Sequence, residues 1–244
     1  MKADANDAAR AAAVTVAHDA AQIWERVLGP RLAGFYLMGS LAHGGFSARY
    51  SDIDVGLIAD NPLEPAECEA VKTEAAARSE ALAGKLSLFW TDRTFSVGRF
   101  PPLDRIDFLD HAITVIERRR FAPERPTRTA VREYLDGKPR QNWSEQVAAL
   151  STMETLTAKD HKRYLRALLY PARYLYSWQT GEIASNDDAV AYVRSLAPAG
   201  LDVDLIGRAL QCRQRGDDPD LLFAERAKLP GLQAACTAIT GAQR

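Results

Sequence analysis

Two aspartates, Asp52 and Asp54, are the residues of this chain best suited to chemistry, because they alternate at the start of an apolar run. Side chains alternate between the two faces of a β-strand, so both carboxylates point the same way if this run is a strand. Two carboxylates held side by side repel each other unless a cation lies between them. Mg²⁺ accepts such oxygen ligands and usually shares them with substrate phosphates. The pair therefore predicts a metal site in which Asp52 and Asp54 are the ligands.

A small turn, Gly39 and Ser40, precedes these acids and closes an earlier apolar run at residues 34–38. Such a turn offers backbone N–H groups and a hydroxyl, which are groups that bind phosphates. The order of apolar run, Gly-Ser turn, polar spacer and acidic strand predicts a site for a metal and a nucleotide together. His43 lies in the spacer, where we expect a solvated loop residue, with contact to a nucleotide as the alternative.

The elements that must position these residues change in character near residue 123. The sequence predicts an α+β fold, in which a mixed sheet with helices is followed by an all-helical bundle. We therefore expect a domain with a mixed sheet over residues 1–123 and a helical domain over 124–244. The first part has predicted helices at 6–29, 41–43, 64–83 and 103–110, and predicted strands at 34–38, 52–59, 86–90 and 113–116. The second part has predicted helices at 128–136, 143–157, 161–180, 187–196, 202–215 and 219–238.

The Gly-Ser turn followed by the Asp-x-Asp strand resembles the signature of the nucleotidyltransferase superfamily. A second resemblance lies in residues 170–185, which are similar to the helical domain of aminoglycoside adenylyltransferases of the streptomycin/spectinomycin type. In that family an arginine, aromatic residues and a Thr-Gly-Lys/Glu-Ile ending follow the catalytic domain, and Arg173 is the matching arginine. Tyr174 and Trp178, at helical spacing, are expected to be packing residues. The two likenesses together cover residues 30–200.

The resemblance implies an enzyme that transfers a nucleoside monophosphate from a nucleoside triphosphate, ATP being favoured, to a hydroxyl of a small molecule. The acceptor would be an aminoglycoside or a molecule of another kind. Asp52 and Asp54 would be the catalytic residues and would hold one or two Mg²⁺ ions. Gly39, Ser40 and Arg173 would bind the nucleotide. The drug-binding acids of the family correspond here to a largely cationic stretch, which disfavours a polycationic acceptor.

The third carboxylate of the family, which comes from the next strand, has no counterpart in residues 86–90. The corresponding position is Lys85 or Ser87, and a lysine cannot bind Mg²⁺. We expect Lys85 to share a sheet face with Asp52 and Asp54, within reach of them. The missing acid leaves a second reading open, namely a degenerate binding protein with the same fold, so the assignment as an enzyme stays open. The other acids that could substitute are Asp92, Asp104, Asp107, Asp110 and Glu154.

Composition narrows the choice of partners. The chain has 244 residues and a net charge of −1, so it has no basic field to recruit nucleic acid. No apolar run has the length of about 20 residues that a membrane span needs, and the N-terminus has no signal-peptide core. Three scattered cysteines form no zinc spacing and fit a reducing cytoplasm. The expected partners are therefore a nucleoside triphosphate and a small acceptor, without a membrane or nucleic acid.

Overall fold

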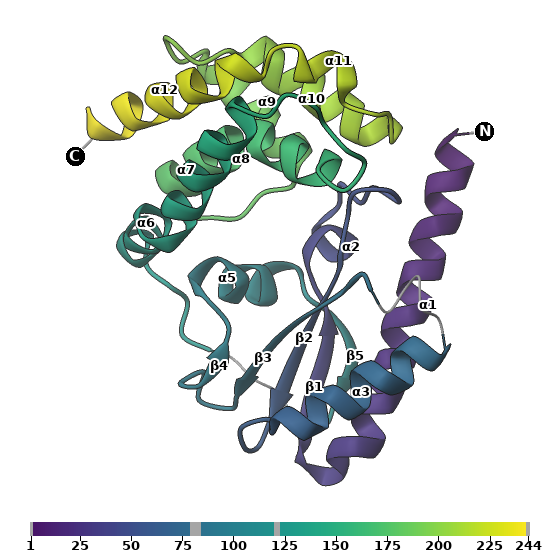
Figure 1. Cartoon of the computed structure of the whole chain (residues 1–244). Coiled ribbons are helices and arrows are strands. Elements are labelled where there is room, and N and C mark those ends of the chain that lie inside the picture. Colours follow the sequence, from purple (N-terminus) through teal and green to yellow (C-terminus); the bar gives the residue numbers. More distant parts are fainter. Residues whose placement is uncertain (1, 79–83, 120–122, 243–244) are drawn as a thin grey trace. The chain divides into compact units, whose positions relative to one another are not determined.

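The computed structural model describes residues 2–78, 84–119 and 123–242 (Figure 1). The chain forms two compact units, Met1–Arg125 and Pro126–Arg244. Among the described residues, every strand lies in the first unit and the second unit contains only helices. The predicted α+β fold is therefore confirmed.

The first unit is built on a mixed five-stranded sheet with the order β4-β3-β2-β1-β5. Strands β2 and β3 run parallel, whereas the other neighbouring pairs are antiparallel. The short strand β4 was not predicted from the sequence; the other four strands were. The strands are β1 (Leu32–Leu37), β2 (Ile53–Ala59), β3 (Leu86–Asp92), β4 (Gly98–Arg99) and β5 (Ile113–Glu117).

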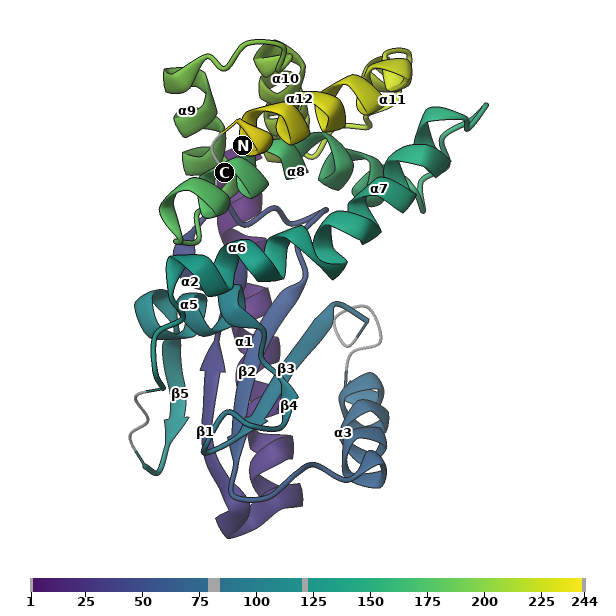
Figure 2. The same cartoon turned by 90° about the vertical axis from the view of Figure 1, so that its left-hand side faces the viewer.

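One face of the sheet is covered by two helices, α1 (Lys2–Leu28) and α3 (Pro65–Arg78), as Figures 1 and 2 show. Val55 and Leu57 of β2 point to this face and pack with the alanine-rich side of α1. Because side chains alternate along a strand, Asp54 points to the opposite face. The predicted helix 64–83 is confirmed over 65–78, and residues 79–83 lie outside the described residues.

The opposite face of the sheet carries helix α5 (Pro102–His111) and an aromatic cluster. Phe108 of α5 meets Tyr36 of β1 edge to face, with ring centroids 4.8 Å apart, and also packs against Phe100. Burial of these rings fixes α5 on the same side of the sheet as Asp54. The short helix α2 (Gly39–His43) connects β1 to the spacer, and His43 is its last residue rather than a loop residue.

The second unit is a helical bundle around α8 (His161–Thr180), which packs against most of the other helices of the unit (Figure 2). Tyr164, Tyr174 and Trp178 of α8 are fully buried, which confirms the expected packing role of the last two. The remaining helices are α6 (Arg128–Asp136), α7 (Lys138–Ser151), α9 (Asn186–Leu196), α10 (Val203–Arg215), α11 (Asp220–Phe223) and α12 (Leu229–Gly241).

Three predicted helix boundaries in this unit are wrong: helix α7 ends at Ser151 instead of 157, and the other two lie beside prolines. Helix α7 begins at Lys138, five residues before the predicted start, with Pro139 in its first turn. The predicted helix 219–238 is divided, because Pro230 lies in the first turn of α12. Proline has no N–H to donate to the preceding turn, so it favours the start of a helix over its interior.

The end of α8 explains the Thr-Gly-Glu-Ile ending as local structure. Gly181 adopts φ +81° and its N–H donates to the carbonyl of Ser177, which ends the helix. Ser185 then caps α9 by accepting a hydrogen bond from the N–H of Asp188. In the described part of the chain no helix is long and apolar enough to cross a membrane.

Candidate active site

The Gly39 turn and the Asp54 carboxylate are in direct contact. Gly39 adopts φ +60°, and a Cβ built on it would lie 2.9 Å from Cγ of Asp54, closer than two carbons approach without bonding. The N–H of Met38, which precedes the turn, donates to the carbonyl of Asp54 at 2.9 Å. Glycine is therefore required here both for its backbone conformation and for the space that the carboxylate occupies.

Ser40 is joined to the residue that precedes the acidic pair. Its Oγ donates to Oγ of Ser51 at 3.0 Å, and Ser51 accepts a second hydrogen bond from the N–H of Ser47. Ser47 and Ser51 are buried, whereas Asp52 and Asp54 are half-buried. This contact closes the spacer, so that the hydroxyl of Ser40 lies at the start of the Asp-x-Asp segment.

The middle of the spacer is held by helix α1. The side-chain amide of Asn6 donates to the carbonyl of Phe46 at 3.2 Å and accepts from the N–H of Ala48 at 3.1 Å. One turn later, Arg10 donates to the carbonyl of Leu41 at 2.9 Å. Backbone groups of the loop and of the preceding helix α2 are therefore satisfied by side chains of α1, and this pairing fixes the spacer.

Lys85, at the position of the missing acid, also binds the spacer. Its ammonium donates to the carbonyl of Ala48 at 2.6 Å, and its own carbonyl accepts the N–H of Ile53. The lysine was expected within reach of the two acids, and its ammonium instead donates to this loop carbonyl. In the parallel pairing of β2 with β3, the partner of Asp54 is Ser87. Ser87 is therefore the residue of β3 beside the acid.

The acid of β3, Asp92, is the last residue of the strand, and its carboxylate binds the turn that follows. Its carboxylate accepts hydrogen bonds from the hydroxyls of Thr94 and Ser96 and from the N–H of Ser96. Partial burial raises the pKa of Asp92, but these hydrogen bonds outweigh it and the pKa is lowered overall. Asp92 therefore stabilises a turn.

Helix α5 brings one further acid, Asp107, to the Gly39 turn. Oδ2 of Asp107 accepts the N–H of Gly39 at 2.7 Å, and Oδ1 lies 4.0 Å from Nε2 of His43. Asp107 is buried, Asp104 is half-buried, and Asp110 forms an exposed ion pair with Arg125. Of these three acids, the sequence favoured Asp104 as a candidate for the third position, not Asp107. Asp107 lies between the buried residues of α5 on either side of it, and helical periodicity offers no signal for a carboxylate there.

Two predicted site residues belong to the second unit. Arg173 is half-buried on α8 near Tyr170, and Glu154 is exposed just after α7. The first unit thus brings together Gly39, Ser40 and Asp54 with Asp107, and Asp52 directly follows Ser51 of the same cluster. The roles of Arg173 and Glu154 stay predictions.

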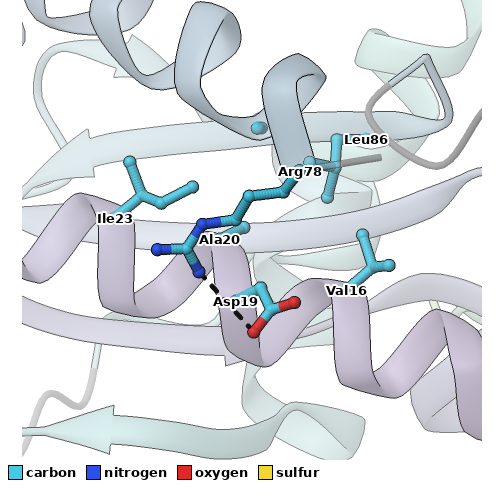
Figure 3. Close-up of a pocket in the computed structure, with 7 residues that line it drawn as sticks. Val16, Asp19, Ala20, Ile23, Arg78 and Leu86 are labelled. Atoms are coloured by element: carbon cyan, nitrogen blue, oxygen red, sulfur yellow. Dashed lines mark ion pairs between the residues drawn. The ribbon is translucent and has the colours of Figure 1, made fainter. Parts of the chain in front are cut away.

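A small hollow on the other face of the sheet is not part of this site (Figure 3). It lies between α1 and α3, where Arg78 forms an ion pair with Asp19 at 3.7 Å over Ile23 and Leu86. Its open space of about 20 Å³ is enough for one water molecule and far too small for a nucleotide.

The donor chemistry of the Asp-x-Asp segment fits Mg²⁺. Carboxylate oxygens are hard ligands, and Mg²⁺ is commonly held by one or two carboxylates while substrate phosphates and water complete its coordination. Among the described residues, no group of three or more His, Cys, Asp and Glu side chains is arranged to hold a metal ion. A site of two carboxylates, Asp52 and Asp54, therefore fits a magnesium ion that is shared with a substrate, and does not fit a metal enclosed by protein.

The structure is similar to the crystal structure of the spectinomycin adenyltransferase AAD(9) from Enterococcus faecialis with ATP and spectinomycin. The TM-score is 0.66 at 14% sequence identity, and the match covers 93% of this chain and 98% of that chain. No family model matches the sequence, and no curated protein matches it. At this identity the likeness establishes the fold.

Proposed function

We propose that this protein is a nucleotidyltransferase that moves a nucleoside monophosphate from Mg²⁺–ATP to a hydroxyl of a small molecule. The observation that carries the proposal is the contact between Gly39 and the Asp54 carboxylate at the end of a nucleotidyltransferase sheet. A glycine at this turn leaves room for the Asp54 carboxylate at the end of the sheet, beside the N–H groups of the turn. The likeness to a structure that contains ATP and a hydroxylated small molecule supports the same class of substrates.

In the proposed reaction the acceptor oxygen attacks the α-phosphorus of the triphosphate. The bond from that phosphorus to the bridging oxygen breaks, pyrophosphate leaves, and the hydroxyl proton passes to a base or to water. Asp52 and Asp54 would hold Mg²⁺, which when bound stabilises the charge on the phosphate oxygens. The hydroxyl of Ser40 would bind a phosphate, and Arg173 is a further proposed nucleotide-binding residue.

The acceptor is proposed to be less cationic than an aminoglycoside. Asp160 is the acid of the stretch that corresponds to the drug-binding acids, and its carboxylate accepts the hydroxyl of Thr157 and pairs with Arg163 at 3.4 Å. The Thr157 hydrogen bond is the largest cause that lowers the pKa of this carboxyl. A carboxylate already satisfied in this way has less to offer an ammonium group of a ligand.

The test is the release of pyrophosphate from Mg²⁺–ATP or Mg²⁺–GTP in the presence of single acceptors. Spectinomycin, streptomycin and neutral hydroxylated compounds such as nucleosides and sugars form the acceptor panel. The proposal predicts acceptor-dependent pyrophosphate release that requires the divalent ion, with the aminoglycosides among the poorer acceptors. Nucleotide hydrolysis that is the same with and without every acceptor would contradict transfer to a small molecule.

A second candidate, a nucleotide-binding protein without transfer activity, is favoured by the composition of β3. Ser87 stands beside Asp54, Lys85 is bound to the spacer, and Asp92 is committed to a turn. Equilibrium titration separates the two candidates, because the second predicts Mg²⁺-dependent binding of ATP with no pyrophosphate released.

A further inference from the structure

The acid of α5 is placed to control the Gly39 turn without entering the reaction. Asp107 is 3% exposed, and one of its oxygens is already bound to the N–H of Gly39 at 2.7 Å. A buried carboxylate that faces a backbone donor cannot also reach an acceptor hydroxyl in solvent. Its chemistry is therefore that of a fixed hydrogen-bond acceptor.

The same carboxylate reaches the two ends of helix α2. Gly39 begins this helix and His43 ends it, with Nε2 of His43 4.0 Å from the second oxygen of Asp107. The side chain of His43 is 10% exposed and its ring packs against His111, with ring centroids 5.7 Å apart. Asp107 thus ties a five-residue helix, too short to be stable alone, to the longer helix α5.

The position of Gly39 decides the position of Asp54. The two are in contact through the Cα of the glycine and the carboxylate of the aspartate, and the preceding Met38 is bonded to the backbone of Asp54. A shift of the turn toward β2 would displace the carboxylate, and a shift away would open the space beside it. The hydrogen bond between Asp107 and the N–H of Gly39 therefore also fixes the position of the Asp54 carboxylate on the other side of the turn.

We propose that Asp107 is a positioning residue, which fixes the Gly39 turn and through it the metal-binding carboxylate of Asp54. The proposal deepens the proposed function and rests on it for the role of Asp54. It also replaces one expectation about the turn, since the N–H of Gly39 is occupied by Asp107 and any donors to a phosphate must follow it in the chain.

The first test is made on the wild-type protein labelled with ¹⁵N. The amide of Gly39 should exchange with solvent at least about tenfold more slowly than that of Gly44, an exposed glycine of the same segment. Equal exchange of the two amides would overturn the proposal. This measurement requires neither a nucleotide nor any activity.

The second test compares Asp107→Asn with Asp107→Leu. The asparagine oxygen can still accept the N–H of Gly39, whereas leucine has a similar size and no acceptor. A hydrogen-bonded Gly39 amide should show a proton resonance shifted downfield and slow exchange with solvent, and these two properties are its amide signature. Asp107→Asn should keep this signature and bind Mg²⁺–ATP within a few-fold of wild type. Leu should lose the amide signature and bind about tenfold or more weakly, the usual cost of removing a group that orients a ligand.

The matched control is Asp110→Leu, which removes an exposed acid of the same helix that pairs with Arg125. It should leave both the amide signature and the binding unchanged. The proposal is overturned if folded Asp107→Leu keeps the Gly39 signature, or if Asp107→Asn fails as completely as Asp107→Leu. If Asp107→Leu does not fold, the exchange of the Gly39 amide in wild type and in Asp107→Asn decides the test. A wild type that binds no nucleotide would instead contradict the proposed function, while the amide measurements would still judge Asp107.

Discussion

Strands β2 and β3 lie side by side in parallel, yet they differ in what they contribute to the candidate site. Strand β2 is buried along most of its length; Asp52 directly precedes it, and Asp54, its second residue, is pressed against Gly39. Strand β3 is half-buried, and the polar residues at its two ends bind loops: Lys85 directly precedes the strand and Asp92 is its last residue. The proposed site is thus supplied by β2 and the residue before it, whereas the polar ends of β3 hold loops in place. A metal bound at the proposed site would depend on two carboxylates and on the precision with which they are held.

The largest effect is expected at the turn that supports β2. In Gly39→Ala the new Cβ would collide with Asp54 at a left-handed backbone position, and the cost should be about 2 to 4 kcal/mol of unfolding free energy. Gly29→Ala is the matched control, because Gly29 has φ +55° and nothing within 4 Å of the added Cβ. It should cost about 1 kcal/mol, from backbone strain alone. Urea unfolding of both proteins measures the difference, and equal losses would show that the contact with Asp54 has no energetic weight.

The next effect is a gain of metal binding when β3 is given an acid. Ser87→Asp places a third carboxylate beside Asp54, the residue with which Ser87 is paired, and should tighten Mn²⁺ binding. Ser87→Asn is the uncharged control and should bind Mn²⁺ as wild type does. Lys85→Glu should gain less than Ser87→Asp, because it also loses the hydrogen bond to Ala48. Titration of Mn²⁺ by electron paramagnetic resonance ranks the variants. A larger gain in Lys85→Glu would place the third ligand position at residue 85.

The smallest effect concerns the other end of β3. Asp92→Ala removes the acceptor for the 92–96 turn and should cost about 1 kcal/mol of stability at pH 7, with metal binding unchanged. Because the pKa of Asp92 is lowered in the folded protein, its contribution is present above the ordinary carboxyl pKa of 3.8 and is lost as the pH falls through the lower folded value. Urea unfolding at pH 7 and near pH 3 should therefore show a smaller difference between the proteins at the acidic pH. An increased difference there would contradict the sign of the shift.

The sequence predicts the elements around the site because their patterns are local. The apolar runs that bracket Gly39 and Asp54 are strands, and the short polar spacer between them can only be a connection. The helices of the second unit likewise follow from their periodicity and caps, as at Gly181 and Ser185. Among the boundaries of the second unit, the starts of α7 and α12, near Pro139 and Pro230, and the end of α7 at Ser151 were misjudged. A proline can either begin a helix or interrupt one, and an apolar period alone does not distinguish the two.

The partners of the polar residues could not be predicted in the same way. Lys85 binds a backbone carbonyl of a loop, and a carbonyl carries no sequence identity. Asp107 looks like a surface acid beside Asp104 and Asp110, and its burial depends on how α5 lies against α2. The contact of Gly39 with Asp54 could be predicted only in part. The motif predicts that the two residues are neighbours, but not that they touch.

The central claim is that the Asp-x-Asp segment is a site for Mg²⁺ and a nucleotide, and Asp54→Asn tests it most directly. Mg²⁺–ATP is titrated calorimetrically into wild type, Asp54→Asn and the control Asp60→Asn, which alters an acid beyond the other end of β2 that pairs with Arg93 and Arg119. We predict that wild type and Asp60→Asn bind alike and only with Mg²⁺ present. Asp54→Asn should keep its melting temperature and lose at least about tenfold in affinity, since changes that merely orient a metal ligand already cost that much. Unchanged Mg²⁺–ATP affinity in folded Asp54→Asn, or no binding by wild type, would contradict the claim.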